Sequence, residues 1–168
     1  MSEPVPRPLE SAVWAALADV PDPEIPTVSV VDLGVVHRVE AERGRIRVEL
    51  LPTFVGCPAV EAMRRGVEER LAGMAAQVEV VTTFRVPWTS DRITAEGRER
   101  LRGSGFAPPV KAVTADSAPA LLPLLPSAIC PHCGSHRTTL ENAFGPTLCR
   151  SIHHCSDCRQ PFEQFKTV

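Results

Sequence analysis

The hydrophobic and polar positions of the chain repeat with two different periods in its N-terminal part. In residues 8–20 the apolar side chains recur at three- or four-residue steps, which predicts an amphipathic helix. Residues 45–51 instead alternate strictly between polar and apolar side chains, which predicts a strand with one buried face. The valine-rich residues 30–40 precede this strand across a turn at 41–44, so we expect the two strands to form a β-hairpin.

A second helix, a third strand and a third helix follow in the same region. The second helix is predicted to start at Pro58, because proline suits the first helical position. Residues 77–86 alternate again and predict a strand, and residues 94–105 predict a helix capped by Thr94. This order of elements predicts an α/β domain of the α+β class, with a small mixed three-stranded sheet, over residues 5–106.

The composition changes after this domain. Residues 107–128 contain five prolines and no helical or strand period, so we interpret them as a linker. Its LLPLLP segment is apolar enough to pack against a neighbouring domain or to serve as a partner site. Residues 129–168 then hold two CxxC pairs, CPHC and CSDC, which are separated by 21 residues.

The paired cysteines are the strongest signal in the sequence. A CxxC turn places two thiolates on one side of a backbone knuckle, and two such knuckles complete a tetrahedron around Zn²⁺. Forty residues with few large apolar side chains cannot form a sufficient core, so the metal would supply folding energy. Iron, disulfides or unligated thiols are the alternatives, and Cys149 could substitute as a ligand. We therefore predict a structural zinc ribbon whose ligands are Cys130, Cys133, Cys155 and Cys158.

Charge and hydropathy exclude several classes of protein. The 168-residue chain has a formal net charge of −2, and residues 127–168 carry four basic and three acidic side chains, a poor footprint for binding nucleic acid. No apolar run reaches the roughly 20 residues of a membrane span, and the first residues do not resemble a secretory signal. We therefore expect a cytoplasmic protein with reduced thiols, which binds other proteins rather than nucleic acid or membranes.

One cysteine, Cys57, stands apart from the others in the stretch TFVGCP. If Pro58 is the first helical residue, Cys57 is the N-cap, where unpaired backbone N–H groups and the helix dipole favour a thiolate. Gly56 can adopt a positive φ and leaves the thiol uncovered. Such a thiolate suits a soft metal or nucleophilic attack, whereas the alternative is a cysteine that merely packs. No adjacent base supports an enzymatic nucleophile.

Three acidic side chains surround the first predicted corner of the chain. Asp22 and Glu24 lie in the proline-broken stretch DPEIP, and Asp32 lies in the following VVDLGVV. Paired carboxylates can perform acid–base chemistry or bind a metal. They can equally cap turns through their own backbone, which leaves the function of this acidic cluster open.

These stretches together resemble a known family. DPEIP, VVDLGVV and TFVGCP resemble the small α/β iron–sulfur cluster assembly factors of the SufT type. PWTSDRITAEGRERLRGSGFAPP, CPHCGS, FGPTLCR and PFEQFK extend the resemblance over nearly the whole chain to the PaaD family, the accessory proteins of phenylacetyl-CoA epoxidase in bacterial phenylacetate catabolism. The chain departs from the family pattern at Arg92, where an aromatic residue is expected, and at SIHH before the last CxxC. We expect both departures to affect surface or client contacts.

The resemblance implies a non-catalytic accessory protein rather than an enzyme. It implies a role in assembling the iron–sulfur cluster, or another metal centre, of the epoxidase reductase, with a transient cluster on this protein. The alternative is a structural adaptor that binds the oxygenase components through the ribbon. The partners implied are these components and iron–sulfur scaffold proteins, and a homodimer could complete a cluster site. The residues implied to contact cluster or client are Cys57, Asp22, Glu24, Asp32, Thr53 and Gly56.

Overall fold

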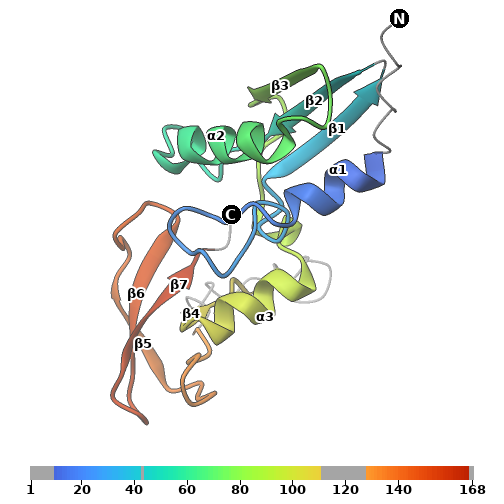
Figure 1. Ribbon diagram of the computed structural model, residues 1–168. Helices are drawn as coiled ribbons and strands as arrows, with labels where there is room; N and C mark the ends of the chain where they lie inside the picture. Colours follow the sequence, from blue (N-terminus) through green and yellow to red (C-terminus); the bar gives the residue numbers. More distant parts are fainter. Residues whose placement is uncertain (1–9, 43, 111–127, 167–168) are drawn as a thin grey trace, which may run out of the picture. The chain divides into compact units, whose positions relative to one another are not determined.

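The computed structural model describes residues 10–42, 44–110 and 128–166 (Figure 1). The chain divides into two compact units. The first comprises Met1–Trp88 and Arg92–Gly97, and the second comprises Thr89–Asp91 and Arg98–Val168. The predicted LLPLLP segment lies outside the described residues.

The first unit is built on a mixed three-stranded sheet of order β1-β2-β3. Strand β1 (Val36–Glu42) pairs antiparallel with β2 (Arg45–Leu50), and β2 pairs parallel with β3 (Gln77–Thr82). Two helices contact this sheet: α1 (Glu10–Leu17) packs on β1, and α2 (Ala59–Leu71) packs on β3. The mixed α/β class and the three-stranded sheet predicted from the sequence are confirmed.

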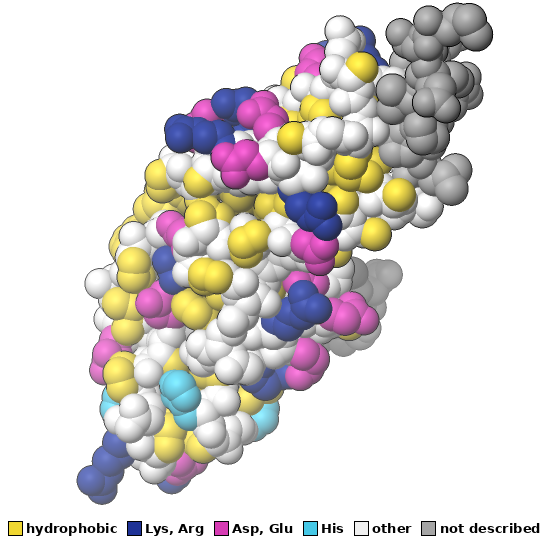
Figure 2. Space-filling model, viewed as in Figure 1, with side chains coloured by type: hydrophobic (Ala, Val, Ile, Leu, Met, Phe, Trp, Pro, Cys, Tyr) yellow, Lys and Arg dark blue, Asp and Glu magenta, His cyan; other side chains and the backbone are white. Residues whose placement is uncertain are grey.

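The two faces of this sheet differ in polarity, as the alternation of polar and apolar residues in the sequence predicts. On β2 the side chains of Ile46, Val48 and Leu50 are buried beneath the helices, where α2 contributes Met63 and Val67. The opposite face carries ion pairs, including Arg47 with Glu79. Arginine and acidic side chains also gather over the outer surface of α2 in Figure 2. Burial of one apolar face therefore holds the first unit together.

The prediction of a strand over residues 30–40 was wrong for its first half. The strand starts only at Val36, and residues 30–34 form turns instead. Gly34 has φ +63°, a conformation that ends an extended strand and that glycine adopts at little cost. Val30 and Val35 are nevertheless buried, so the valine-rich run reflects burial rather than extended structure.

The ends of other elements also differ from those predicted. The strand predicted over 77–86 ends at Thr82, and the backbone N–H of Arg85 bonds to the Thr83 hydroxyl at 3.3 Å instead of continuing a ladder. The third helix, α3 (Ala95–Gly103), is capped as predicted, because the Thr94 hydroxyl accepts a hydrogen bond from the Gly97 N–H at 2.9 Å. A short 3₁₀ helix, η1 (Ser90–Arg92), precedes it.

The second unit contains a four-stranded sheet of order β4-β7-β6-β5. Strands β5 (Thr138–Asn142), β6 (Arg150–Cys155) and β7 (Pro161–Phe165) form an antiparallel meander. Strand β4 (Phe106–Ala107) adds parallel to β7, although no local pattern predicts a strand at these two residues. The buried cluster of this unit consists of Ala107, Ala128, Cys130, Cys155 and Phe162.

Candidate metal centre and cysteine turn

The two CxxC pairs of the second unit form nearly identical backbone knuckles. In the first, the Cys130 carbonyl accepts a hydrogen bond from Gly134 N–H, and the Cys130 N–H donates to the Ser135 carbonyl, both at 2.9 Å. In the second, the Cys155 carbonyl accepts from Arg159 N–H at 2.9 Å, and the Cys155 N–H donates to the Gln160 carbonyl at 3.0 Å. Equivalent bonds at equivalent positions therefore turn each pair of thiols to one side of its loop.

The fourth residue after the first cysteine of each knuckle has a left-handed backbone conformation. Gly134 has φ +74° in the first knuckle, and Arg159 has φ +59° in the second. Arg159 is the only non-glycine residue with positive φ among the described residues. The second knuckle thus adopts the same left-handed conformation as the first, although arginine disfavours that conformation.

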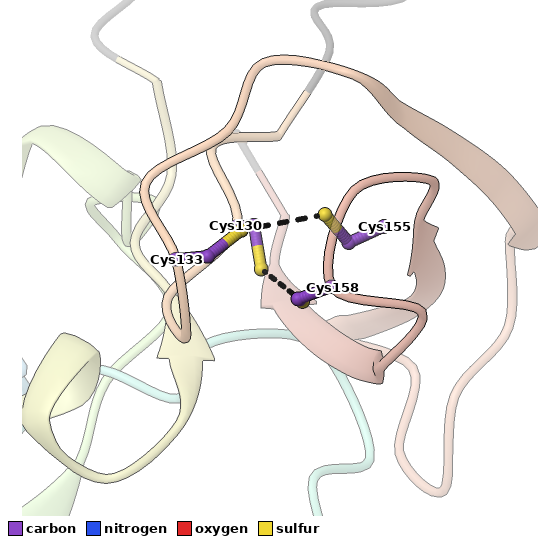
Figure 3. A group of neighbouring side chains, drawn as sticks. All are labelled: Cys130, Cys133, Cys155 and Cys158. Carbon is purple, nitrogen blue, oxygen red and sulfur yellow. Dashed lines mark hydrogen bonds between the residues drawn. The ribbon is translucent and has the colours of Figure 1, made fainter.

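The four sulfur atoms converge as tetrahedral metal ligands would. The Sγ atoms of Cys130 and Cys158 lie 3.6 Å apart, as do those of Cys133 and Cys155 (Figure 3). All four lie within 4.8 Å of one another. A tetrahedral ion with metal–sulfur bonds of about 2.3 Å requires sulfur–sulfur distances of about 3.8 Å. The residues present therefore fit a zinc-sized cation.

The pKa values of Cys133, Cys155 and Cys158 are shifted in different directions. A backbone hydrogen bond from Cys158 lowers the pKa of Cys155 to about 7, whereas burial raises the pKa of Cys158 to about 12. For Cys133 a backbone hydrogen bond from Ser135 opposes the shift, yet desolvation and the thiols of Cys155 and Cys130 raise its pKa. Four adjacent thiols cannot all ionise together, because each thiolate repels the next. A bound divalent cation would remove this conflict.

This cluster has four protein ligands and no place for a fifth from the nearby side chains. Cys149, which the sequence offered as a possible ligand, lies outside the group, and its Sγ contacts the Thr147 hydroxyl at 3.2 Å. Within the described ranges, no other group of three or more His, Cys, Asp or Glu residues could hold a metal ion. A closed set of four thiolates indicates a structural centre rather than a catalytic one.

Cys57 occupies a tight turn at the end of the loop that follows β2. The Cys57 N–H donates to the Phe54 carbonyl at 3.3 Å, and Gly56 has φ +84° at the third position of this turn. Glycine at that position with such a φ is typical of a type II turn. Thr53 is buried and Cys57 is half-buried, so the thiol is accessible from solvent while its backbone is fixed.

The predicted position of Cys57 relative to the helix needs a correction. Helix α2 begins at Ala59 and its N-cap is Pro58, so Cys57 lies one residue before the cap. Pro58 already has helical dihedral angles, with φ −68° and ψ −22°, and the Cys57 carbonyl accepts a hydrogen bond from Val60 N–H at 3.4 Å.

The acidic cluster divides into two buried turn-forming residues and one exposed residue. Asp22 Oδ1 accepts hydrogen bonds from the N–H groups of Glu24 at 2.9 Å and Ile25 at 2.8 Å. Asp32 Oδ2 accepts from Ser29 N–H at 2.9 Å, and Asp32 N–H donates to the Ser29 hydroxyl at 3.0 Å. These bonds fit the turn-capping interpretation that the sequence left open, and the exposed Glu24 shares no metal group with Asp22 and Asp32.

The DLG turn has a structural role that the sequence did not reveal. Its three consecutive carbonyls accept hydrogen bonds from the segment after β3. The Asp32 carbonyl accepts from the Thr94 N–H at 2.9 Å, and the Leu33 carbonyl accepts from the Trp88 indole N–H at 2.8 Å. The Gly34 carbonyl accepts from Arg92 Nε at 3.0 Å. Arg92, expected to make surface contacts, is therefore half-buried and supports this turn. No local sequence signal could have identified these donors, because they lie far along the chain.

Two glycines allow the close approach of these segments. A Cβ atom on Gly34 would lie 2.4 Å from the backbone oxygen of Arg92, and one on Gly97 would lie 2.5 Å from that of Asp32. Backbone atoms cannot yield as a flexible side chain would. The glycine of the DLG motif is thus required for packing as well as for its positive φ.

Comparison with known proteins finds two family matches in the chain. Residues 10–82 match the family model described as "Iron-sulfur cluster assembly protein", and residues 116–166 match the "PaaD zinc beta ribbon domain". A domain of unknown function, DUF59, from Bacillus anthracis has a similar crystal structure, with a TM-score of 0.51 and 27% identity over 55% of this chain and 90% of that one. None of the described helices is long and apolar enough to cross a membrane.

These matches define the class as an iron–sulfur-assembly-type domain joined to a zinc ribbon. The chain is also 38% identical over 157 residues to a putative 1,2-phenylacetyl-CoA epoxidase subunit of Escherichia coli K12, covering 93% of this chain and 92% of that protein. The chain therefore belongs to the PaaD family.

Proposed function

We propose that this protein is a non-catalytic accessory factor that assists assembly of the iron–sulfur cluster in the reductase component of phenylacetyl-CoA epoxidase. The observation that carries the proposal is the combination of an assembly-type domain and a PaaD ribbon in one chain, together with similarity to an epoxidase subunit over nearly its full length. In this proposal it acts in the cytoplasm, during phenylacetate catabolism.

Cys57 is the residue proposed to hold the cluster in transit. Its half-buried thiol lies on a fixed turn and belongs to no metal group among the described residues. An iron–sulfur cluster needs about four ligands, so the cluster would be shared with thiols of a scaffold protein, of the client or of a second copy of this chain. Thr53 and Gly56 would contribute by keeping the turn in place, and Asp22, Glu24 and Asp32 remain predicted client contacts.

The four ribbon cysteines are proposed to hold Zn²⁺ permanently. The ion would supply folding free energy to the second unit and would take no part in cluster transfer, because all four of its positions are occupied by thiolates. Cys130, Cys133, Cys155 and Cys158 are the proposed ligands, because their sulfur atoms converge on one point.

The test is the cluster content of the reductase in cells that carry Cys57→Ser. We expect the variant to fold normally and the reductase to contain much less iron and sulfide per chain than with the wild type. Cys149→Ser is a matched control, because Cys149 is also a half-buried thiol outside the four-cysteine group. Full cluster content with Cys57→Ser would contradict the proposal.

A structural adaptor is the second candidate, and one observation favours it. The ribbon exposes Phe144 and Leu148, which are 64% and 56% accessible, in the loop between β5 and β6. Exposed apolar side chains often mark protein contacts. An adaptor predicts stable co-purification with the oxygenase components that Cys57→Ser leaves unchanged and that Phe144→Ser disrupts.

A further inference from the structure

The exposed large apolar side chains of the first unit all occur in two loops. Among its described residues these are Val55, Phe84 and Val86, which are 82%, 62% and 40% accessible. The rest of this unit's surface carries paired charges, such as Arg64 with Glu61 on α2. Such a concentration of apolar side chains differs from the scattered exposure that is ordinary on protein surfaces.

The two loops leave the sheet side by side. Strands β2 and β3 are parallel, with Leu50 opposite Thr82, so both strands end at the same edge of the sheet. The Thr83 N–H donates to the Leu50 carbonyl at 2.9 Å, which keeps the chains adjacent beyond the strand ends. Partners and ligands commonly bind at the carboxyl edge of parallel strands. The loop with Val55 also carries Cys57.

A cation without an ion pair lies between Phe84 and Val86 in the loop that follows β3. The guanidinium of Arg85 has no ion-pair partner among the described residues, whereas Arg47 on the neighbouring sheet face pairs with Glu49 and Glu79. Arg85, Thr82 and Thr83 line a small recess of about 190 Å³ together with Val81, Arg47 and Glu49. Glu49 already pairs with Arg47 there, so the Arg85 guanidinium is the charge on this recess that is left to bind a carboxylate.

We propose that Val55, Phe84, Arg85 and Val86, here called the carboxyl-edge surface, dock a partner protein that presents an apolar side chain next to a carboxylate. The exposed apolar residues would bury the partner's apolar side chain, and Arg85 would pair with its acid. This inference rests on the proposed function, because it assigns the surface beside Cys57 to the client that receives the cluster.

The test is the affinity of the full-length protein for the purified apo-reductase, measured by titration at two salt concentrations. Phe84→Ser should weaken binding by about tenfold or more, since apolar anchors dominate interface energy. Arg85→Glu should weaken binding by about tenfold at low salt, and Arg85→Lys should retain most of the affinity. Wild-type binding should weaken as salt rises, and that dependence should diminish in Arg85→Glu.

Matched controls come from the same chain. Phe144→Ser removes a phenylalanine of nearly equal exposure from the ribbon, and Arg38→Glu reverses an exposed charge on β1. Both variants should bind the apo-reductase within about twofold of the wild type. Thermal unfolding of Phe84→Ser should match that of the wild type, because Phe84 is largely in water and outside the core.

The outcomes separate this inference from the proposed function. Binding that Phe84→Ser and Arg85→Glu leave unchanged would overturn the docking surface, and so would an equal loss in Phe144→Ser. Weaker binding in the two surface variants, with full reductase cluster content in Cys57→Ser, would uphold the docking surface while contradicting the proposed role of the thiol.

Discussion

The two compact units keep their folds by different means. Of the twelve largest fully buried side chains in the described part of the chain, eleven belong to the first unit, and Leu101 is the exception. The buried cluster of the ribbon has one large side chain, Phe162, and two of its five members are the cysteines Cys130 and Cys155. The first unit is therefore stabilised by apolar burial, whereas the second has a small core beside a group of four thiols that can hold a structural metal.

This difference also separates the two kinds of cysteine. In the ribbon two equivalent knuckles turn the thiols toward one another, so the four thiols can bind one shared metal ion. In the first unit Cys57 lies on a hydrogen-bonded turn and belongs to no group of three or more metal-binding side chains among the described residues. Because the sheet supplies stability in this unit, the fold does not require a metal at Cys57.

Metal removal should have the largest effect and should be confined to one unit. Apparent zinc-binding free energies of small zinc domains are roughly 10–16 kcal/mol, more than the ribbon core could replace. We expect a strong chelator, or Cys155→Ser, to unfold the β5–β7 meander while the β1–β3 sheet stays folded. Amide hydrogen exchange measured residue by residue would check this. Continued protection of β6 without metal would contradict the distinction between the units.

Gly97→Ala should destabilise the first unit through a single added methyl group. The new Cβ would lie 2.5 Å from the Asp32 carbonyl oxygen, so the backbone must move. We expect a loss of about 1–3 kcal/mol in the free energy of unfolding. Gly103→Ala is the control in the same helix, because no heavy atom lies within 4 Å of its Cβ position. Alanine there should be neutral or stabilising by up to about 1 kcal/mol.

Arg159→Gly should stabilise the second knuckle. Arg159 has φ +59°, which costs a non-glycine residue about 1–2 kcal/mol, and the equivalent residue of the first knuckle is Gly134. Glycine also gains entropy in the unfolded chain, so the net gain should be about 1 kcal/mol or less. The melting temperature of the zinc-loaded ribbon would measure it, with Gly134→Ala as the reverse change. A lower melting temperature in Arg159→Gly would show that the arginine side chain makes a contact worth more than the strain.

The parts of the structure that could be predicted are those set by local pattern. Strict alternation predicted β2, helical spacing predicted α2, and the doubled CxxC predicted the metal group. The sequence of the DLG stretch was misleading, because its valines are buried in turns. What decides that conformation is Trp88, Arg92 and Thr94, which bond to it from far along the chain. Strand β4 could not be predicted, because two residues are too few to show an alternating pattern. They form a strand only by pairing with β7.

A Cys→Ser substitution should change stability far less in the first unit than in the ribbon, and Cys57→Ser is the smallest effect expected. Cys57→Ser replaces a half-buried thiol on a turn that a backbone hydrogen bond and Gly56 already fix, so the free energy of unfolding should change by no more than about 0.5 kcal/mol. Cys155→Ser removes a metal ligand and should abolish the ribbon fold. Thermal unfolding of each variant, followed separately in the two units, would measure the contrast. If Cys57→Ser instead destabilised the first unit by more than about 1.5 kcal/mol, the thiol would be a packing group like the other buried apolar side chains. The first unit would then offer no thiol available to carry a cluster, and the adaptor function would become the better account.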